Sequence, residues 1–195
     1  KAKAVDNALM EKIELRRQQL SKLLEQLENF SPTESDSKAE AKQILKGKSG
    51  KASLKQEEET LQIKIEKLTN EIAHAIKNEL LKKVKDVNGI NFLAEKIEIS
   101  NADSVKRISF DLKNEVKNLF CLLTAEIDGK PHLSLIISEN LVKEKNLDAS
   151  KIISELAKEI QGGGGGQPFY ATAGGKNVSG LTKVIEKSNA LFTDV

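Results

Sequence analysis

Apolar residues recur at helical spacing through the first thirty positions of the chain. Most of them lie three, four or seven residues apart, which would place one apolar stripe on a helix that is otherwise charged or amide-bearing. The stripe would consist of Val5, Leu9, Ile13, Leu20, Leu23, Leu24, Leu27 and Phe30. The pattern predicts a helix that ends at Ser31-Pro32, because the residue before a proline is pushed out of the α region.

A second stripe, with near-heptad spacing, predicts another long helix. It would consist of Leu54, Leu61, Ile65, Leu68, Ile72, Ile76, Leu80 and Val84. Between the two stripes, Ser37-x-x-Glu40 has the form of a capping box and predicts a short helix that closes at Gly47. Two long one-sided helices predict an antiparallel hairpin with apolar surface to spare, so we expect a homodimer. The predicted dimer interface residues are Leu61, Ile65, Leu68 and Ile72.

The pattern changes at Asn88-Gly89, after which strand-like and helix-like segments are mixed. The predicted strands lie at residues 92–99, 119–127, 133–137 and 169–173, with a turn at Asp128-Gly129. The predicted helices present Val105, Ile108, Leu112 and Val116, then Ile152, Ile153, Leu156 and Ile160, then Leu181, Val184, Ile185 and Leu191. We therefore predict an α+β fold: a long antiparallel helical hairpin in residues 1–87, then a small mixed-sheet domain with a glycine-rich loop in residues 88–195.

Charge and composition narrow the function classes only slightly. The net charge is +2, with 18 Lys and Arg against 15 Asp and Glu in residues 1–87, and 13 against 14 in residues 88–195. Neither part has the basic excess that by itself announces nucleic-acid binding. The single cysteine excludes an intramolecular disulfide framework. Without a long apolar run or a signal peptide, we expect a soluble, cytoplasmic piece of a longer polypeptide with no membrane partner.

The residues that usually carry metal binding or catalysis are few. His74, His132 and Cys121 show no ligand spacing, so no metal site is expected. Cys121 lies inside an apolar strand and is interpreted as a small core residue. His132 heads a strand beside a turn, where it is either an ordinary surface residue or an RNA contact. No nucleophile elbow, nucleotide fingerprint or supported carboxylate pair occurs, so we expect no catalytic centre in this sequence.

Five consecutive glycines, residues 162–166, stand out, and Gly174 and Gly175 follow closely. Glycine permits positive φ and close approach of another backbone, at a cost in conformational entropy. A flexible linker is one interpretation. We favour an ordered loop, because Phe169-Tyr170 and an amphipathic helix follow at once. Its amides would contact an anion or a nucleic acid, with charge from Lys176 and an aromatic stacking face. The residues alone favour the other interpretation, in which one aromatic fills the core and the glycines merely allow a tight crossing.

The run GGGGGQPFYATAGGK, residues 162–176, closely resembles a signature near the C-terminus of alanyl-tRNA synthetases. The same domain type, the C-Ala or DHH-associated domain, accompanies DHH phosphoesterases. The segments ADSVKRISFDLKNEV, EIDGKPHLSLIIS and DASKIISELAKEI are also similar to that family, so the resemblance covers essentially the whole chain. The sequence departs from the family pattern at Gln167, where relatives often carry Arg, which removes a charge-assisted contact. It also departs at Phe169-Tyr170, where polar or smaller residues are common.

The resemblance implies a non-catalytic region with a helical part used for dimerisation and a globular part that binds the outer corner of tRNA. Aminoacylation and editing would be carried out by other domains of an alanine–tRNA ligase, which would use ATP, Mg and Zn, whereas this region would need no cofactor. One alternative is the RNA-substrate-binding domain of a DHH-family phosphoesterase. Another is a ligand-free coiled-coil dimerisation module.

The expected tRNA contacts lie in the glycine run and the residues that follow it. They are Gly162, Gly163, Gly164, Gly165, Gly166, Gln167, Phe169, Tyr170, Gly174, Gly175, Lys176, Lys183 and Lys187. Lys106 and Arg107, on the first helix of the predicted globular domain, are further candidates.

Overall fold

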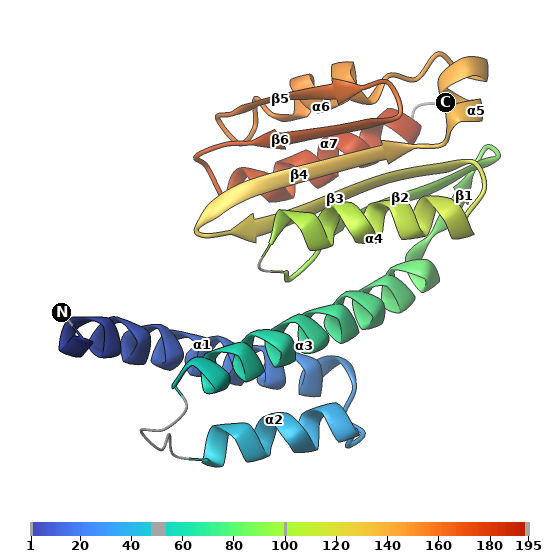
Figure 1. The fold of residues 1–195 in the computed structure, drawn as a ribbon. Coiled ribbons are helices and arrows are strands. Elements are labelled where there is room, and N and C mark those ends of the chain that lie inside the picture. The colour runs from blue at the N-terminus through green and yellow to red at the C-terminus, as the bar shows by residue number, and fades with distance from the viewer. Residues whose placement is uncertain (1, 48–53, 100, 194–195) are drawn as a thin grey trace. The chain divides into compact units, whose positions relative to one another are not determined.

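A computed structural model describes residues 2–47, 54–99 and 101–193, and Figure 1 shows their fold. The chain divides into two compact units, residues 1–75 and residues 76–195. This division falls inside a long helix, whereas the sequence predicts a boundary at Asn88-Gly89, where the structure has a turn between two strands. Among the described residues, no helix is long and apolar enough to cross a bilayer.

The described part of the first unit is helical. It contains α1 (Ala2–Phe30), α2 (Asp36–Lys46) and most of α3 (Leu54–Lys83), which continues into the second unit. As predicted, α1 ends just before Ser31-Pro32. Helix α2 begins at Asp36, two residues before the helix start that the capping-box pattern predicts, because Ser35 is the N-cap and its side chain accepts a hydrogen bond from the backbone N–H of Lys38.

Three helices, and not a two-helix hairpin, bury the apolar stripes among the described residues of this unit. The buried apolar residues are Ile13, Leu20, Leu23, Leu24, Leu27, Ala41, Leu61, Ile65, Leu68, Ile72 and Ala73. Helix α2 contacts both long helices, through an ion pair of 3.0 Å between Lys42 and Glu28 of α1 and through an ion pair between Glu40 and Lys64 of α3. The two-helix hairpin predicted from the sequence therefore did not include the packing of α2 on both long helices.

The four residues predicted to form a dimer interface are buried within a single chain. Leu61 and Leu68 are 0% exposed, Ile72 is 1% and Ile65 is 5% exposed. The interface prediction requires them to be exposed, and they are not, because the stripe is covered within the first unit. Dimerisation itself stays a prediction.

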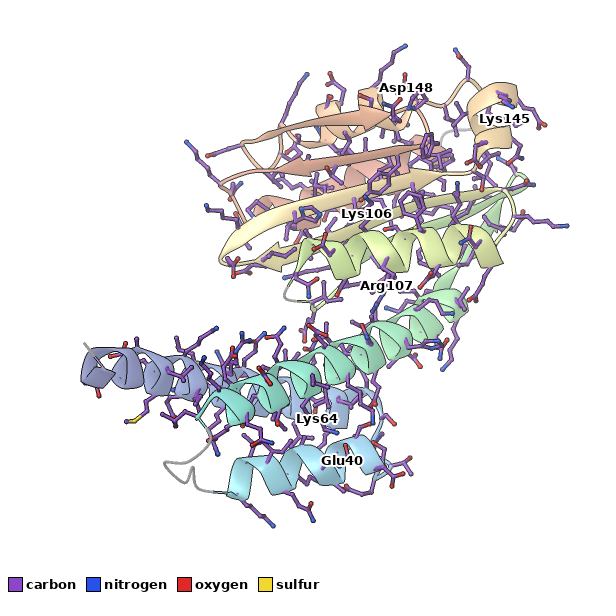
Figure 2. All side chains as sticks on the ribbon, in the orientation of Figure 1. Glu40, Lys64, Lys106, Arg107, Lys145 and Asp148 are labelled. Carbon is purple, nitrogen blue, oxygen red and sulfur yellow. The ribbon has the colours of Figure 1, made fainter. Side chains whose placement is uncertain are left out.

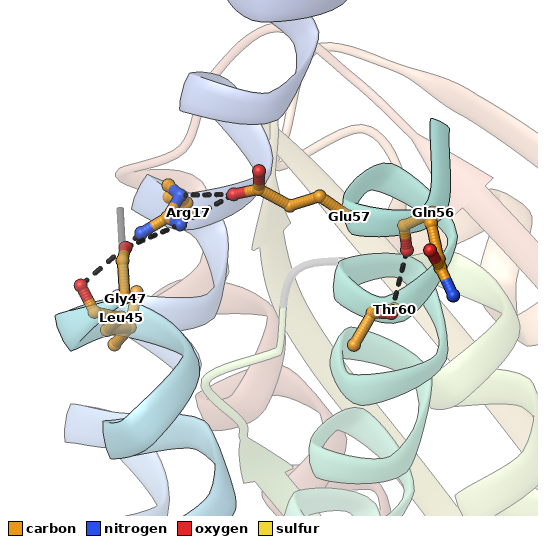
Figure 3. Close-up of polar contacts among 6 residues, drawn as sticks. All are labelled: Arg17, Leu45, Gly47, Gln56, Glu57 and Thr60. Atoms are coloured by element: carbon orange, nitrogen blue, oxygen red, sulfur yellow. Dashed lines mark hydrogen bonds and ion pairs between the residues drawn. The ribbon is translucent and has the colours of Figure 1, made fainter. Parts of the chain in front are cut away.

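Arg17 ties the three helices of the first unit together (Figure 3). Its guanidinium donates hydrogen bonds to the carbonyl oxygens of Leu45, at 3.3 Å, and Gly47, at 2.8 Å, at the end of α2. The same group forms an ion pair of 2.5 Å with Glu57 of α3. Because the last carbonyls of a helix lack partners within the helix, Arg17 satisfies groups that would otherwise need water or a cap.

The second unit is built on a mixed, six-stranded sheet with the strand order β1-β2-β3-β4-β6-β5. Strands β2 and β3 run parallel and the other neighbours run antiparallel. The strands are β1 (Lys85–Val87), β2 (Ile90–Lys96), β3 (Leu119–Ile127), β4 (Lys130–Ile137), β5 (Gly163–Gln167) and β6 (Tyr170–Gly174). The helices are α4 (Ala102–Glu115), α5 (Glu139–Glu144), α6 (Ala149–Leu156) and α7 (Gly180–Thr193). The predicted α+β class is confirmed.

Different helices cover the two faces of this sheet (Figure 1). Helix α4 packs on β3 and β4 from one face, and α6 and α7 pack on the other. Strand alternation shows the division: Leu133 and Leu135 join the core under α6 and α7, whereas the hydroxyl of Ser134 lies 3.1 Å from that of Ser109 in α4. Residues of one strand are thereby directed to two separate layers.

The closing helix, α7, buries Leu181 and Val184 as predicted, but it leaves Leu191 48% exposed, so that part of the prediction was wrong. The neighbouring Phe192 takes the core position instead. Its ring packs on those of Phe92 and Phe120, with centroids 5.0 and 4.7 Å away. Phe192 lies nearer the middle of the buried face, because it follows the buried Ser188 by four residues, whereas Leu191 lies toward the edge of that face.

Candidate nucleic-acid interface

The glycine run forms a β-strand, so the ordered loop predicted from the sequence was wrong. Strand β5 pairs antiparallel with β6, in the register Gly163 with Gly174, Gly165 with Thr172, and Gln167 with Tyr170. Pro168 and Phe169 form the tight turn between the two strands. Since β6 pairs with β4 on its other side, β5 is an edge strand of the sheet.

Alternate glycines of the run are required because no space exists for a side chain. A Cβ atom at Gly162 would lie 2.0 Å from the carbonyl oxygen of Gly174, and one at Gly166 would lie 2.4 Å from that of Tyr170. A Cβ atom at Gly164 would meet Thr172 in the same way. At Gly163, by contrast, nothing lies within 4 Å. Close approach of two backbones, and not positive φ, explains these glycines, since among the described residues positive φ occurs in glycine only at positions 89 and 129.

At one end of the β5–β6 hairpin, the surface forms a pocket of about 530 Å³. Its lining residues come from the start of α4, the β3–β4 turn and both ends of the glycine-rich segment. They are Ala102, Ile127, Lys130, Pro131, His132, Gln161, Gly162, Gly174, Gly175 and Lys176. The fold therefore brings four of the predicted contacts, Gly162, Gly174, Gly175 and Lys176, to one site and adds Lys130 and His132. We call this the basic pocket.

The charge of the basic pocket is positive and unneutralised. No acidic residue lines it, and within the described residues neither Lys130 nor Lys176 forms an ion pair. Burial lowers the pKa of His132, so its imidazole is mostly neutral near pH 7 and offers one N–H donor. The first turn of α4, which begins at Ala102 beside the pocket, presents the positive end of a helix dipole, which the carboxylate of Asp103 in the same turn partly offsets. Such a site suits an anionic group.

The position of Lys176 is set by its own backbone. Its N–H donates to the carbonyl oxygen of Ile160 at 2.9 Å, and the N–H of Asn177 donates to the same oxygen at 3.0 Å. A Cβ atom at Gly175 would lie 2.2 Å from that oxygen, so this approach to the end of the α6 segment needs glycine. The segment Gly174-Gly175-Lys176 thus holds a lysine at the rim of the pocket on an anchored backbone.

Phe169 and Tyr170 lie at the other end of the hairpin, away from the basic pocket. The ring of Tyr170 packs against that of Phe110 in α4, with centroids 5.0 Å apart. The ammonium of Lys106 lies 5.9 Å from the centroid of the Tyr170 ring, and Figure 2 shows Lys106 on the side of α4 that faces the strands. Arg107 lies on a different side of the same helix (Figure 2). The aromatics are half-buried, so neither fills the core.

Lys183 and Lys187 do not join the other predicted contacts. Both lie on α7, which packs on the face of the sheet opposite α4. Lys187 forms an ion pair of 2.5 Å with Glu159. Sequence proximity to the glycine run was misleading for these two lysines, because the chain passes to the other face after Gly175.

The sequence analysis did not predict Lys130, which lines the basic pocket, or Phe110, which packs on Tyr170. Lys130 follows the Asp128-Gly129 turn, and only the pairing of His132 with Gly174 brings it near the glycines.

Cys121, as predicted, is a core residue: it is fully buried in β3, and burial raises the pKa of its thiol. Among the described residues, no group of three or more His, Cys, Asp or Glu side chains is placed to hold a metal ion.

Comparisons with known proteins agree with this fold. The model of the DHHA1 domain family matches residues 89–194. The chain is 46% identical to the alanine–tRNA ligase of Cytophaga hutchinsonii over 139 residues, which are 71% of this chain and 16% of that protein. The alanine–tRNA ligase of Christiangramia forsetii is similar to the same extent, at 46% identity over 139 residues, again 71% of this chain and 16% of that protein. The chain thus spans less than a fifth of the length of these curated relatives.

A solved structure shares the fold of about half of this chain. The C-Ala domain of Aquifex aeolicus alanyl-tRNA synthetase matches with a TM-score of 0.51 and 17% sequence identity. The match covers 56% of this chain and 97% of that domain.

Proposed function

This chain belongs to the DHHA1 domain family, and from that premise we propose that it is the non-catalytic C-terminal region of an alanine–tRNA ligase, which binds tRNA through its second unit. In this proposal the region supports aminoacylation and editing of tRNA(Ala), whose centres lie in other domains. The parent enzyme would work in the cytoplasm with ATP, Mg and Zn, and the region itself would use no cofactor.

The basic pocket is the observation that carries the proposal. Lys130 and Lys176 are not neutralised by acidic neighbours, and the glycines of β5 beside them present backbone without side chains. A phosphate needs positive charge and hydrogen-bond donors at close range, and both are available here. Since the net charge of the chain is only +2, we expect few phosphate contacts and a modest dependence of affinity on salt.

Dimerisation belongs to the first unit in this proposal. The residues first assigned to the interface are buried, so the contact would have to use apolar side chains that remain at the surface. Met10, Leu15 and Ile63 are 53%, 66% and 67% exposed. Sedimentation equilibrium of the 195-residue chain should give a dimer mass, and a charged substitution, Ile63→Glu, should shift the distribution toward monomer. A monomer at all concentrations would contradict this part of the proposal.

The experiment that tests the tRNA-binding proposal is a titration of a tRNA(Ala) transcript with the 195-residue chain at several salt concentrations. We expect saturable binding at low ionic strength that weakens as salt rises, because bound lysines release counterions from the RNA. A folded chain, verified by circular dichroism, that binds no tRNA at low ionic strength would disprove the proposal.

A further inference from the structure

A second surface, toward the opposite end of the β5–β6 hairpin from the basic pocket, has different chemistry. It consists of three aromatic rings and two lysines, which we call the aromatic strip: Lys106, Phe110, Lys113, Phe169 and Tyr170. The three rings are each half-buried. By contrast, Phe192 of α7 packs against Phe92 and Phe120 of the sheet. In a chain with few aromatic residues, a surface cluster of this kind calls for an explanation other than core packing.

The Tyr170 ring is held in a defined position. It packs at 54° against the ring of Phe110. Its hydroxyl lies 3.5 Å from that of Ser134, which is itself 3.1 Å from the hydroxyl of Ser109. Both serines are essentially inaccessible to solvent. The ring is half-buried and the ammonium of Lys106 lies over it, so a base that stacks there displaces Lys106 but costs the ring little conformational freedom.

The two lysines place positive charge beside the rings. The ammonium of Lys106 lies 5.9 Å from the Tyr170 centroid, and that of Lys113 lies 5.4 Å from the Phe169 centroid. Lys113 is also paired with Glu139 at 2.6 Å, whereas Lys106 has no ion pair within the described residues. Lys106 is therefore the more available cation, and its flexible side chain can move from the ring to a phosphate.

The aromatic strip and the basic pocket lie on the same face of the sheet. Tyr170, Thr172 and Gly174 alternate along β6 and share that face, and Gly174 lines the pocket. The four-residue separation between Tyr170 and Gly174 corresponds to about 13 Å along a strand. Helix α4 follows the same direction, from Ala102 at the pocket to Phe110 at the strip. Beside β6, Gly163 adds backbone without a side chain.

We propose that this face binds unpaired nucleotides of RNA, with a base stacked on Tyr170 and the sugar–phosphate backbone running along β6 to the basic pocket. The inference rests on the proposed function and specifies which feature of the RNA this face recognises. A base offers a flat π surface to an aromatic ring, and lysines beside the ring contact the adjacent phosphates, which is the chemistry of single-strand binding surfaces. A fully paired duplex keeps its bases stacked inside and would meet only the lysines.

Tyr170→Leu and Tyr170→Phe form a matched pair for the test. Leucine keeps an apolar side chain at this half-buried strand position but removes the ring, whereas phenylalanine keeps the ring and removes only the hydroxyl near Ser134. The probes are a tRNA(Ala) transcript and a fully paired RNA duplex of similar length. We expect Tyr170→Leu to weaken binding of the transcript about tenfold, with duplex binding unchanged and with Tyr170→Phe close to the unaltered chain.

The outcomes separate this inference from the proposed function. If Lys176→Glu weakens transcript binding and Tyr170→Leu does not, the stacking inference is overturned while the proposed function stands. Equal losses for transcript and duplex in Tyr170→Leu would also overturn it. Failure of the unaltered chain to bind the transcript would instead refute the proposed function. Should Tyr170→Leu prove unstable, ultraviolet crosslinking of the unaltered chain to 4-thiouridine-labelled transcript decides: a crosslinked peptide that contains Tyr170 supports stacking, and crosslinks found only elsewhere contradict it.

Discussion

A Cβ atom on Gly164 would lie 2.3 Å from the carbonyl oxygen of Thr172 on the paired strand. The Cβ atom would meet backbone atoms of Thr172 and Ala173, which cannot move aside as a flexible side chain can. A substitution must therefore displace a strand. The same arrangement repeats at Gly162 and Gly166. The glycine run is therefore first a packing feature, and its exposed surface is available for binding as a consequence.

We predict that Gly164→Ala destabilises the second unit by about 1–3 kcal/mol, the usual cost of forcing an extra methyl group into a packed site. Gly163→Ala is the matched control, because nothing lies within 4 Å of its Cβ position and alanine has the smaller entropy cost in a strand. Urea denaturation of the two variants measures the difference. Equal stability of both variants would contradict the packing argument.

Arg17 makes a testable contribution to the first unit. Arg17→Met removes the donors to Leu45 and Gly47 and the ion pair with Glu57, leaving carbonyl groups at the end of α2 without these partners (Figure 3). We expect a loss of about 1–3 kcal/mol in the free energy of unfolding, measured by thermal denaturation.

Lys12→Met is the control for Arg17. Lys12 pairs with Glu58 at 2.9 Å, but its side chain is 56% exposed, and exposed ion pairs contribute about 0–1 kcal/mol. An effect of Lys12→Met as large as that of Arg17→Met would show that the carbonyl contacts of Arg17 are unimportant.

Lys176→Glu should weaken binding of a tRNA(Ala) transcript without lowering the melting temperature. Lys176 is an exposed lysine at the rim of the basic pocket with no ion pair among the described residues, so its replacement costs the fold little. If it contacts one phosphate, the slope of log affinity against log salt should fall by about 1. Lys183→Glu carries the same charge change on the opposite face. Equal weakening by both variants would indicate attraction by net charge and not by the pocket.

Burial of the His132 imidazole should make the stability of the fold depend on pH. Burial lowers the pKa of its imidazole below the ordinary value of about 6.5. As the pH falls through that value, the unfolded chain takes up a proton before the folded chain does, so the free energy of unfolding decreases. We expect the melting temperature to fall between about pH 7 and pH 5, and to fall less in His132→Gln. An unchanged pH profile in that variant would rule out a contribution from His132.

Local sequence patterns predicted many elements correctly because their causes are local. Proline at position 32 ends α1, and Asp128-Gly129 forms a turn with φ of 51° and 71°. Local patterns could not predict that the glycine run forms a strand. Residues 163–166 have no side chains to alternate, and glycine has a low strand propensity, so only pairing with β6 makes this segment a strand.

The sequence by itself determined most of the helices, the Asp128-Gly129 turn and the resemblance to the DHH-associated domain, because each depends on residues close together in the chain. Only the tertiary structure decided which residues share a surface. The strand order β4-β6-β5 brings Lys130 and His132 to Lys176, while the chain's return on the opposite face separates Lys183 and Lys187 from them. The physical reason is that hydrogen-bond pairing between strands, and the layering of helices on two faces, join segments that sequence spacing keeps apart.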